Sequence, residues 1–253
     1  MRPILKPACP KVGGVDKSVT DYHYWKSDLE KAIGMFCSYC GMRLTNSPQV
    51  EHVVPQNPMA GNPSGNPLVW DNVVLSCSAC NGANGKSNKD YNEVQHYIPE
   101  KHNTLLPFKY SLPATPGHIT IEIADGLLPL QHTKAMDTIV VFNFQNIDTR
   151  ENKFDFRSSE RWQAKETADA AYENFMMAKV SPSFEQDKAS SNVARQAVSA
   201  GFFQLWVEVF IDEPEVLKKL IHPDFHPGTH QQSFDAITGK PCTRNPLNLT
   251  DPI

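Results

Sequence analysis

The sequence lacks any apolar run of the length needed to cross a bilayer. Its most apolar runs, such as Thr138–Phe144, fall far short of the roughly 18 residues that a membrane helix requires. The first residues, Met1–Pro7, also lack the apolar block of a signal peptide. We therefore expect a protein with no membrane segment that is located in the cytoplasm.

The sequence also lacks the basic excess that is typical of proteins that bind nucleic acid by themselves. The chain has 24 Lys and Arg against 28 Asp and Glu, a formal net charge of −4. The two counts are 9 and 9 for residues 1–100 and 15 and 19 for residues 101–253, so the second part carries all of the net negative charge. Because affinity for the phosphate backbone comes mostly from Lys and Arg, a partner would have to supply part of the affinity for a nucleic acid.

Cysteine is scarce, with six residues in 253, and yet four of the six form two pairs of equal spacing. The pairs, Cys37-x-x-Cys40 and Cys77-x-x-Cys80, have the spacing and separation of a tetrahedral Cys₄ zinc site. Such a site has no open coordination position, so the zinc would be structural and not catalytic. A disulfide framework is the alternative. Zinc ribbons and rubredoxin-like iron sites share this spacing, so the ligands alone do not define a function.

The first hundred residues predict a small hairpin that the metal holds together. Residues 1–20 contain three prolines and two glycines, which exclude a long helix and predict an extended leader on the surface. A helix is predicted from Asp21, a suitable N-cap, to Gly34, which favours termination. Two strands and a short helix follow, at Gln49–Val54, Val69–Leu75 and Ser76–Asn81. With one cysteine pair before it and one at its end, this is a ββα hairpin clamped by a metal ion.

Prolines after residue 88 predict a boundary near residue 100. Beyond it, strands are predicted at His118–Ala124 and Asp137–Phe144, and helices at Ser159–Lys179, Val193–Phe210 and Pro214–Ile221. The expected fold class is α+β, a ββα-metal core with structural zinc and a mainly helical C-terminal region with a few strands. The expected domains are an extended leader (1–20), a zinc-stapled domain (21–100) and an α-rich accessory or partner-docking domain (101–253).

Three histidines near the end of the chain form a weaker pattern. His222, His226 and His230 recur every four residues, as they would on one side of a helix that binds a metal. Pro223 and Pro227 interrupt that helix, however, and so argue against a second metal site.

The residues in and just after this interval include a candidate general base and candidate oxygen ligands for a hard cation. His52 has an ordinary pKa near 6.5, so a neutral imidazole can take a proton from water at physiological pH. Glu51 precedes it and points to the opposite side of a strand, so the two do not share one role. Oxygens from Glu51 and from the Asn81 side chain would suit Mg²⁺ or a similar ion.

This segment resembles the HNH, or His-Me finger, endonucleases. The resemblance lies in Glu51-His52-x-x-Pro55 and in Asn72-Val-Val-Leu-x-Cys-x-x-Cys-Asn81, and it covers residues 37–88. It implies that His52 is the general base, that Asn72 orients the loop that carries His52, and that Glu51 and Asn81 bind a catalytic Mg²⁺ or Mn²⁺ ion. Many members of the family carry Asp or His in place of Glu51 and His in place of Asn81.

The implied substrate is nucleic acid, with DNA favoured over RNA. Lys86 follows the motif at a position where a cation near the scissile phosphate would help, and an exposed, solvated lysine is the alternative. The first residues, the helix before Cys37 and the long C-terminal extension also resemble the HNH subunits of bacterial anti-phage defence systems of the Septu type, which act beside an ABC/SMC-like ATPase. The contrasting hypothesis is a non-catalytic zinc adaptor in a nucleic-acid-processing complex.

Overall fold

The computed structural model describes residues 1–46, 48–59, 61–112, 116–145, 147–148, 153–154 and 156–253. In chain order the elements are β1 (Lys11–Val12), β2 (Val15–Asp16), η1 (Tyr22–Trp25), α1 (Lys26–Ile33), β3 (Gln49–His52), η2 (Trp70–Asn72), β4 (Val73–Ser76), α2 (Ser78–Asn81), β5 (Phe108–Ser111), β6 (Thr120–Ile123), α3 (Pro129–Phe142), β7 (Ile147–Asp148), β8 (Lys153–Phe154), α4 (Phe156–Lys179), α5 (Gln186–Ala200), α6 (Phe203–Val209), α7 (Pro214–Ile221) and η3 (Gln231–Ser233).

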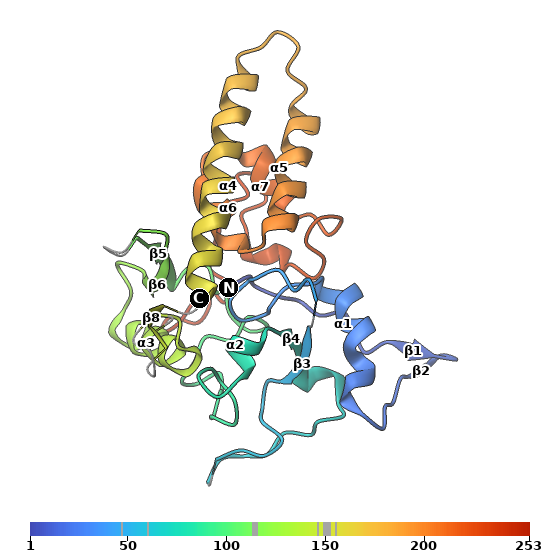
Figure 1. Ribbon diagram of the computed structural model, residues 1–253. Helices are drawn as coiled ribbons and strands as arrows, with labels where there is room; N and C mark the ends of the chain where they lie inside the picture. Colours follow the sequence, from blue (N-terminus) through green and yellow to red (C-terminus); the bar gives the residue numbers. More distant parts are fainter. Residues whose placement is uncertain (47, 60, 113–115, 146, 149–152, 155) are drawn as a thin grey trace.

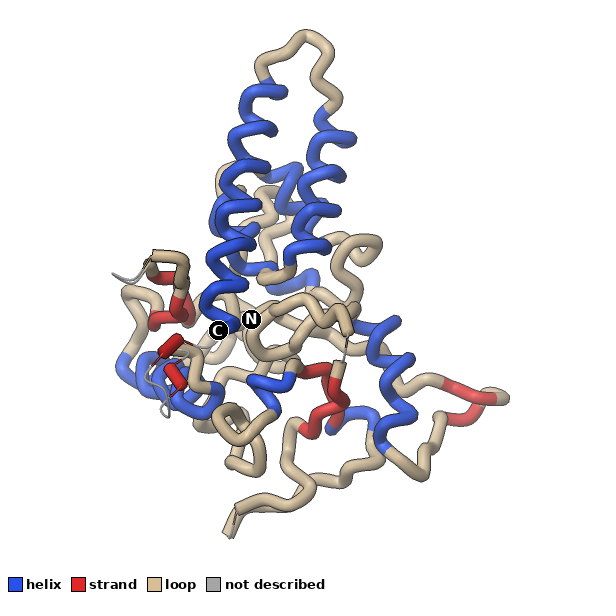
Figure 2. Tube along the Cα trace, in the orientation of Figure 1, coloured by secondary structure: helices blue, strands red, loops and turns tan. Residues whose placement is uncertain are grey.

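The chain forms a helical part that rises from a broader base. Helices α4 and α5 pack side by side as a long hairpin with α6 and α7 against them, and the base holds α1, α2, α3 and the β3–β4 hairpin (Figure 1). Within the described residues the strands form four separate antiparallel pairs, all of them short (Figure 2). The predicted α+β class, with a ββα core and a mainly helical C-terminal region, is confirmed.

The β3–β4 hairpin and α2 form the predicted ββα unit. Strand β3 pairs with β4 in antiparallel register, with His52 opposite Val73 and Gln49 opposite Ser76, and α2 begins two residues after β4 ends. Side chains on both faces of β4 are buried, as its run of β-branched and apolar residues favours. The strands are shorter than predicted, because residues 70–72 form the 3₁₀ turn η2 instead of the start of β4.

Elements η1 and α1 form the predicted helix before the first cysteine pair. Asp21 caps η1 by accepting a hydrogen bond from the His23 N–H, and Gly34 ends α1 with a positive φ of 73°. Trp25, Leu29 and Ile33 are buried and pack in the same apolar cluster as the β3–β4 hairpin. The helix ends shortly before Cys37, as predicted.

Only the first four residues differ from the predicted surface leader, and residues 11–16, for example, are exposed. Met1, Arg2 and Ile4 are buried. The Ile4 N–H donates to the carbonyl of Pro99, and Arg2 donates to the Thr229 hydroxyl. The pattern of prolines excluded a helix correctly, but it carries no information about burial. This leader fastens the base of the molecule to the segment that follows α7.

The predicted strand at Asp137–Phe144 is wrong, because these residues form the end of α3 and the turn after it. The β-branched run from Thr138 to Val141 favours a strand locally. Tertiary packing decides otherwise. Ala135, Ile139 and Phe142 are buried at helical spacing, while Val140 between them is 65% exposed. A strand would have alternated burial along this run.

The predicted helix at Val193–Phe210 is interrupted between α5 and α6. Gly201 and Phe202 both have positive φ values, 76° and 54°. The break lets the Phe202 N–H donate to the carbonyl of Gly41 (2.7 Å) and forms a β-bridge between Gly201 and Met42. A Cβ at position 201 would lie 2.6 Å from the Arg43 nitrogen, so only glycine fits this close approach. The helical part is thereby joined to the turn that carries the first cysteine pair.

Two clusters of buried apolar side chains fill the interior. The first surrounds α1, the hairpin and one face of α3, and it includes Ile253; the second lies among α4, α5, α6 and α7. The division into domains at residue 100 stays a prediction, but α3 and Ile253, which lie beyond that residue, pack on the first cluster.

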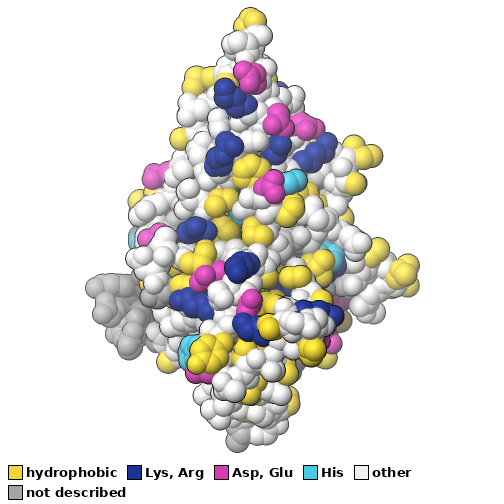
Figure 3. Space-filling model, turned by 90° about the vertical axis from the view of Figure 1, so that its right-hand side faces the viewer, with side chains coloured by type: hydrophobic (Ala, Val, Ile, Leu, Met, Phe, Trp, Pro, Cys, Tyr) yellow, Lys and Arg dark blue, Asp and Glu magenta, His cyan; other side chains and the backbone are white. Residues whose placement is uncertain are grey.

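The surface carries charges of both signs. On the face shown in Figure 3, Lys and Arg side chains are scattered among Asp and Glu and do not form one continuous basic area. Among the described residues there is no helix with the length and apolar character of a membrane span.

Candidate active site and metal centre

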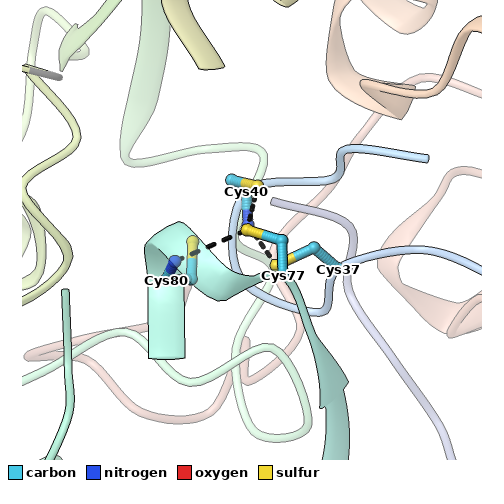
Figure 4. A group of neighbouring side chains, drawn as sticks. All are labelled: Cys37, Cys40, Cys77 and Cys80. Carbon is cyan, nitrogen blue, oxygen red and sulfur yellow. Dashed lines mark hydrogen bonds between the residues drawn. The ribbon is translucent and has the colours of Figure 1, made fainter. Parts of the chain in front are cut away.

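The four paired cysteines come together in a single buried cluster. Their sulfur atoms all lie within 4.8 Å of one another, and the Sγ atoms of Cys40 and Cys77 are 3.8 Å apart. Cys37 and Cys40 flank a turn after α1, Cys77 follows β4, and Cys80 lies in α2, so that the side chains converge from both ends of the ββα unit (Figure 4). Zinc–sulfur bonds of about 2.3 Å give a tetrahedron with edges of about 3.8 Å. The cluster is therefore compatible with Zn²⁺.

Local hydrogen bonds shape each half of the cluster in the same way. The Cys40 N–H donates to Cys37 Sγ (3.5 Å), and the Cys80 N–H donates to Cys77 Sγ (3.4 Å). Burial raises the pKa of the Cys37 thiol, but hydrogen bonds from the other three cysteines outweigh burial and hold that pKa well below its usual value. The thiolate, the form that binds metals, is thus favoured at Cys37, whereas a hydrogen bond to Cys37 raises the pKa of Cys77 and burial raises that of Cys80.

Arg157 of α4 brings a positive charge to the cluster. Its guanidinium is fully buried and donates to Cys80 Sγ (3.2 Å) and to the carbonyl oxygens of Phe142 and Asn143. Donors of this kind offset the negative charge of a thiolate site and orient its ligands. No sequence motif points to Arg157. Its helical spacing from Ala164 and Ala168, which are buried on the same helix, is the pattern that could have predicted its burial.

His52 is the last residue of β3, and its imidazole is 9% exposed. The ring nitrogen Nε2 lies 3.3 Å from the carbonyl oxygen of Pro67, and the ring of Tyr22 contacts the imidazole edge to face at 4.6 Å. Burial lowers the pKa of His52, the hydrogen bond to Pro67 opposes this, and Lys86 and His23 lower it further. The net direction favours a neutral imidazole.

Asn72 fastens the two ends of the long loop between the strands. Its Oδ1 accepts from the Val54 N–H (2.8 Å), and its Nδ2 donates to the carbonyl oxygens of Val54 (3.0 Å) and Asn66 (3.1 Å). A Cβ at Gly65 would lie 2.3 Å from the Val54 oxygen and 2.5 Å from Asn72 Nδ2, so the loop closes only with glycine there. Asn72 thus fixes the backbone two residues after His52.

Glu51 forms a buried ion pair with Lys86. Lys86 Nζ donates to Glu51 Oε1 at 2.6 Å, and the two side chains are 0% and 8% exposed. Burial raises the pKa of Glu51, and the pair with Lys86 opposes that rise. The alternative of an exposed, solvated Lys86 is therefore wrong. Glu51 and His52 leave β3 on opposite faces, as adjacent strand residues do.

Asn81 ends α2 and lies over the Glu51 side of β3. Its Nδ2 donates to Gln49 Oε1 (3.0 Å), and Gln49 shares a face of the strand with Glu51 because the side chains alternate. This hydrogen bond uses the amide nitrogen of Asn81. The amide oxygen is the atom that would bind a cation.

The three C-terminal histidines do not form a cluster. His226 is buried, with Nδ1 2.8 Å from the Leu220 carbonyl, and the Nδ1 of His230 lies 2.9 Å from the Ser233 hydroxyl. Within the part of the chain that the structure describes, the four cysteines form the one group of His, Cys, Asp and Glu side chains arranged to hold a metal ion.

Residues 37–87 match the family model of the HNH endonucleases. The match begins at Cys37, ends one residue after Lys86 and includes all of the predicted site residues. Comparison with curated proteins and with solved structures gives no match. The chain therefore contains an HNH domain, and this domain indicates nuclease chemistry. Residues before 37 and after 87, including all of the helical part, lie outside the match.

We expect the purified protein to contain one tightly bound Zn²⁺ ion, and Cys77→Ser to lose both the ion and the folded state. A structural zinc site contributes on the order of 10 kcal/mol to folding, which exceeds the stability of many domains. Atomic emission and circular dichroism measure the two effects. Cys9→Ser, which changes a cysteine outside the cluster, is the control and should keep both. A Cys77→Ser protein that retains zinc and melts like the wild type would contradict the assignment.

We expect Lys86→Met to lower the free energy of unfolding by about 3 kcal/mol, because it leaves the Glu51 carboxylate buried without its partner. The double variant Glu51→Gln/Lys86→Met removes both charges and should recover much of the loss. Lys218→Met breaks an exposed pair with Glu215 and should change stability by less than about 1 kcal/mol. Urea denaturation measures all three, and equal losses for Lys86→Met and Lys218→Met would refute a stabilising role for the buried pair.

Proposed function

We propose that this protein is a metal-dependent HNH endonuclease that hydrolyses phosphodiester bonds in nucleic acid. The observation that carries the proposal is the fixed imidazole of His52 within the HNH match. It lies at the end of β3, with a carbonyl at one nitrogen and the Asn72-clamped backbone directly after it.

The contacts of His52 identify the nitrogen that would act as the base. The Pro67 carbonyl can only accept a hydrogen bond, so Nε2 must carry the proton in that contact. In the neutral imidazole Nδ1 then holds the lone pair. We assign Nδ1 as the general base that takes a proton from the attacking water, and Asn72 as the residue that holds the adjacent backbone in place.

Glu51 and Asn81 are the proposed ligands of a catalytic Mg²⁺ or Mn²⁺ ion. The donor set fits, because both offer oxygen, the atom that these hard cations prefer, and both lie on the same side of β3. Lys86 already holds Oε1 of Glu51, so the ion would bind through the other carboxylate oxygen or displace the lysine. When bound, such an ion stabilises the charge that develops on the phosphate and on the departing 3′ oxygen.

Zn²⁺ at the cysteine cluster has a structural role in this proposal. With four sulfur ligands it has no open position for water or a phosphate oxygen. It holds the turn before β3 and the helix after β4 in fixed positions, and so sets the relation between His52, Asn72 and Asn81.

The substrate would reach this site with help from a protein partner. The net charge of −4 and the mixed charges on the face in Figure 3 offer little affinity for a polyanion. We propose that residues 101–253 dock or regulate the nuclease, and that an ABC/SMC-like ATPase of a bacterial anti-phage defence system is the partner. DNA is the favoured substrate and RNA the alternative. We place the protein in the cytoplasm, where reducing conditions would keep the four clustered cysteines available to bind zinc.

We expect the purified protein to cleave DNA or RNA when Mg²⁺ or Mn²⁺ is added, and His52→Ala to reduce the rate by at least about 10²-fold because the general base is lost. The variant should keep its zinc, since His52 is not part of the sulfur cluster. His132→Ala, which removes an exposed histidine in α3, is the control and should cut normally. Equal cleavage by wild type and His52→Ala would point to a contaminating nuclease and favour the non-catalytic zinc adaptor.

We expect the inactive His52→Ala protein, purified from its native host, to carry an ATPase in a fixed ratio to the chain. Loss of catalysis removes toxicity and leaves every docking surface intact. Size-exclusion chromatography with mass determination gives the stoichiometry. A chain that elutes alone and, in its wild-type form, cleaves nucleic acid at physiological salt without help would refute the need for a partner.

A further inference from the structure

The contact between Tyr22 and His52 joins an element outside the HNH match to the proposed catalytic base. Tyr22 begins η1, fifteen positions before Cys37, where the match starts. Its ring centroid is 4.6 Å from that of His52, and the two planes meet at 66°, an edge-to-face arrangement. Strand β3 also has contacts with η1 along the backbone. No residue of the helical C-terminal part contributes to this contact.

Tyr22 also contacts the ring of its neighbour His23. That ring stacks on Tyr22 at 4.0 Å, and Oδ1 of Asp21 lies 2.7 Å from His23 Nδ1. The same carboxylate accepts from the His23 N–H and so caps η1. The phenol ring therefore contacts two imidazoles, one of which is the proposed base.

Element η1 is fastened to the loop that supplies the other contact of His52. The indole N–H of Trp25 donates to the Leu68 carbonyl (3.1 Å), and the Trp25 ring packs on Trp70 with centroids 5.3 Å apart. Leu68 directly follows Pro67, whose carbonyl faces His52 Nε2. Tyr22 and Pro67 thus belong to one connected unit, and they hold the imidazole from two sides.

A single hydrogen bond of 3.3 Å leaves the imidazole free to tilt about the Nε2 contact. A ring against its side removes that freedom. We propose that Tyr22 is a positioning residue that holds the His52 imidazole in the orientation in which Nδ1 meets the attacking water. This inference rests on the proposed function and adds to it a residue that lies outside the HNH domain. A displacement of a catalytic group by about 1 Å can cost on the order of 10²-fold in rate, so the contact bears directly on turnover.

The test compares Tyr22→Leu, Tyr22→Phe and Tyr24→Leu. The first removes the ring, the second keeps the ring and removes only the hydroxyl, and the third removes an exposed tyrosine of the same short helix. We expect kcat of Tyr22→Leu to fall by about 10- to 100-fold with KM nearly unchanged. Tyr22→Phe and Tyr24→Leu should both cut at close to the wild-type rate.

A second measurement follows the imidazole itself by NMR. The ring-proton signals of His52 are identified by their loss in His52→Ala, and their NOEs to neighbouring residues report the ring orientation without the ring-current shift that Tyr22→Leu itself causes. These NOEs should change in Tyr22→Leu and stay as in the wild type in Tyr22→Phe and Tyr24→Leu. Zinc content should be equal in the wild type and these three variants. Wild-type kcat and unchanged His52 NOEs in Tyr22→Leu would overturn the inference, and so would a Tyr22→Phe protein as slow as Tyr22→Leu. If the wild type does not cleave at all, the proposed function fails, while the His52 NOEs still decide whether Tyr22 orients the ring.

Discussion

Four sulfur atoms converge at the ends of one small hairpin, β3–β4. The rest of the structure around this hairpin depends on that constraint. The hairpin has only four residues in each strand, too few to be stable by backbone pairing alone. The cluster joins its two ends, Cys37 and Cys40 before β3 and Cys77 and Cys80 after β4. Buried side chains of α1 pack in the same apolar cluster as the four cysteines, and Arg157 of the helical part donates to Cys80. A metal at the cluster would thus stabilise far more than the turn that carries it.

Side chains with proposed chemical roles lie on two sides of β3. His52 faces η1 and the Pro67 carbonyl, Glu51 faces Lys86 on the opposite side of β3, and Asn81 comes from α2. The last two residues of β3 therefore present an imidazole and a carboxylate to opposite sides of the strand. The loop between the strands is closed by Asn72, so the base and its neighbours move together.

Much of this arrangement could be predicted because it is encoded locally. The spacing of the cysteine pairs, the Asp21 cap and the helix at Pro214–Ile221 each depend on a few adjacent residues, and the structure has them where the sequence indicated. The errors arise where distant parts of the chain decide. The β-branched end of α3 is helical because its apolar side packs on the first core cluster, and the helix at Val193–Phe210 is broken because Gly201 bridges to Met42.

Within the site, too, local features could be predicted and long-range contacts could not. The eight predicted site residues lie in a single match to a family model, but the motif does not identify the residues that they contact. Lys86 is five residues from Asn81, and only the fold shows that it pairs with Glu51 instead of facing solvent. Tyr22 and Arg157 contact His52 and Cys80 from outside the motif, and no spacing rule connects them. Long-range pairs of this kind are set by packing and leave no local pattern.

The attachment of the α4–α5 hairpin has a mechanical consequence. Arg157, near the start of α4, donates to Cys80, and Gly201 and Phe202, just after α5, contact Met42 and Gly41, which directly follow Cys40. The hairpin is thus attached next to both halves of the sulfur cluster. A protein that tilted the far end of the α4–α5 hairpin would therefore move both halves of the cluster at once. Because the helices are long, a large movement at their far end would become a small movement at the β3–β4 hairpin, which carries His52.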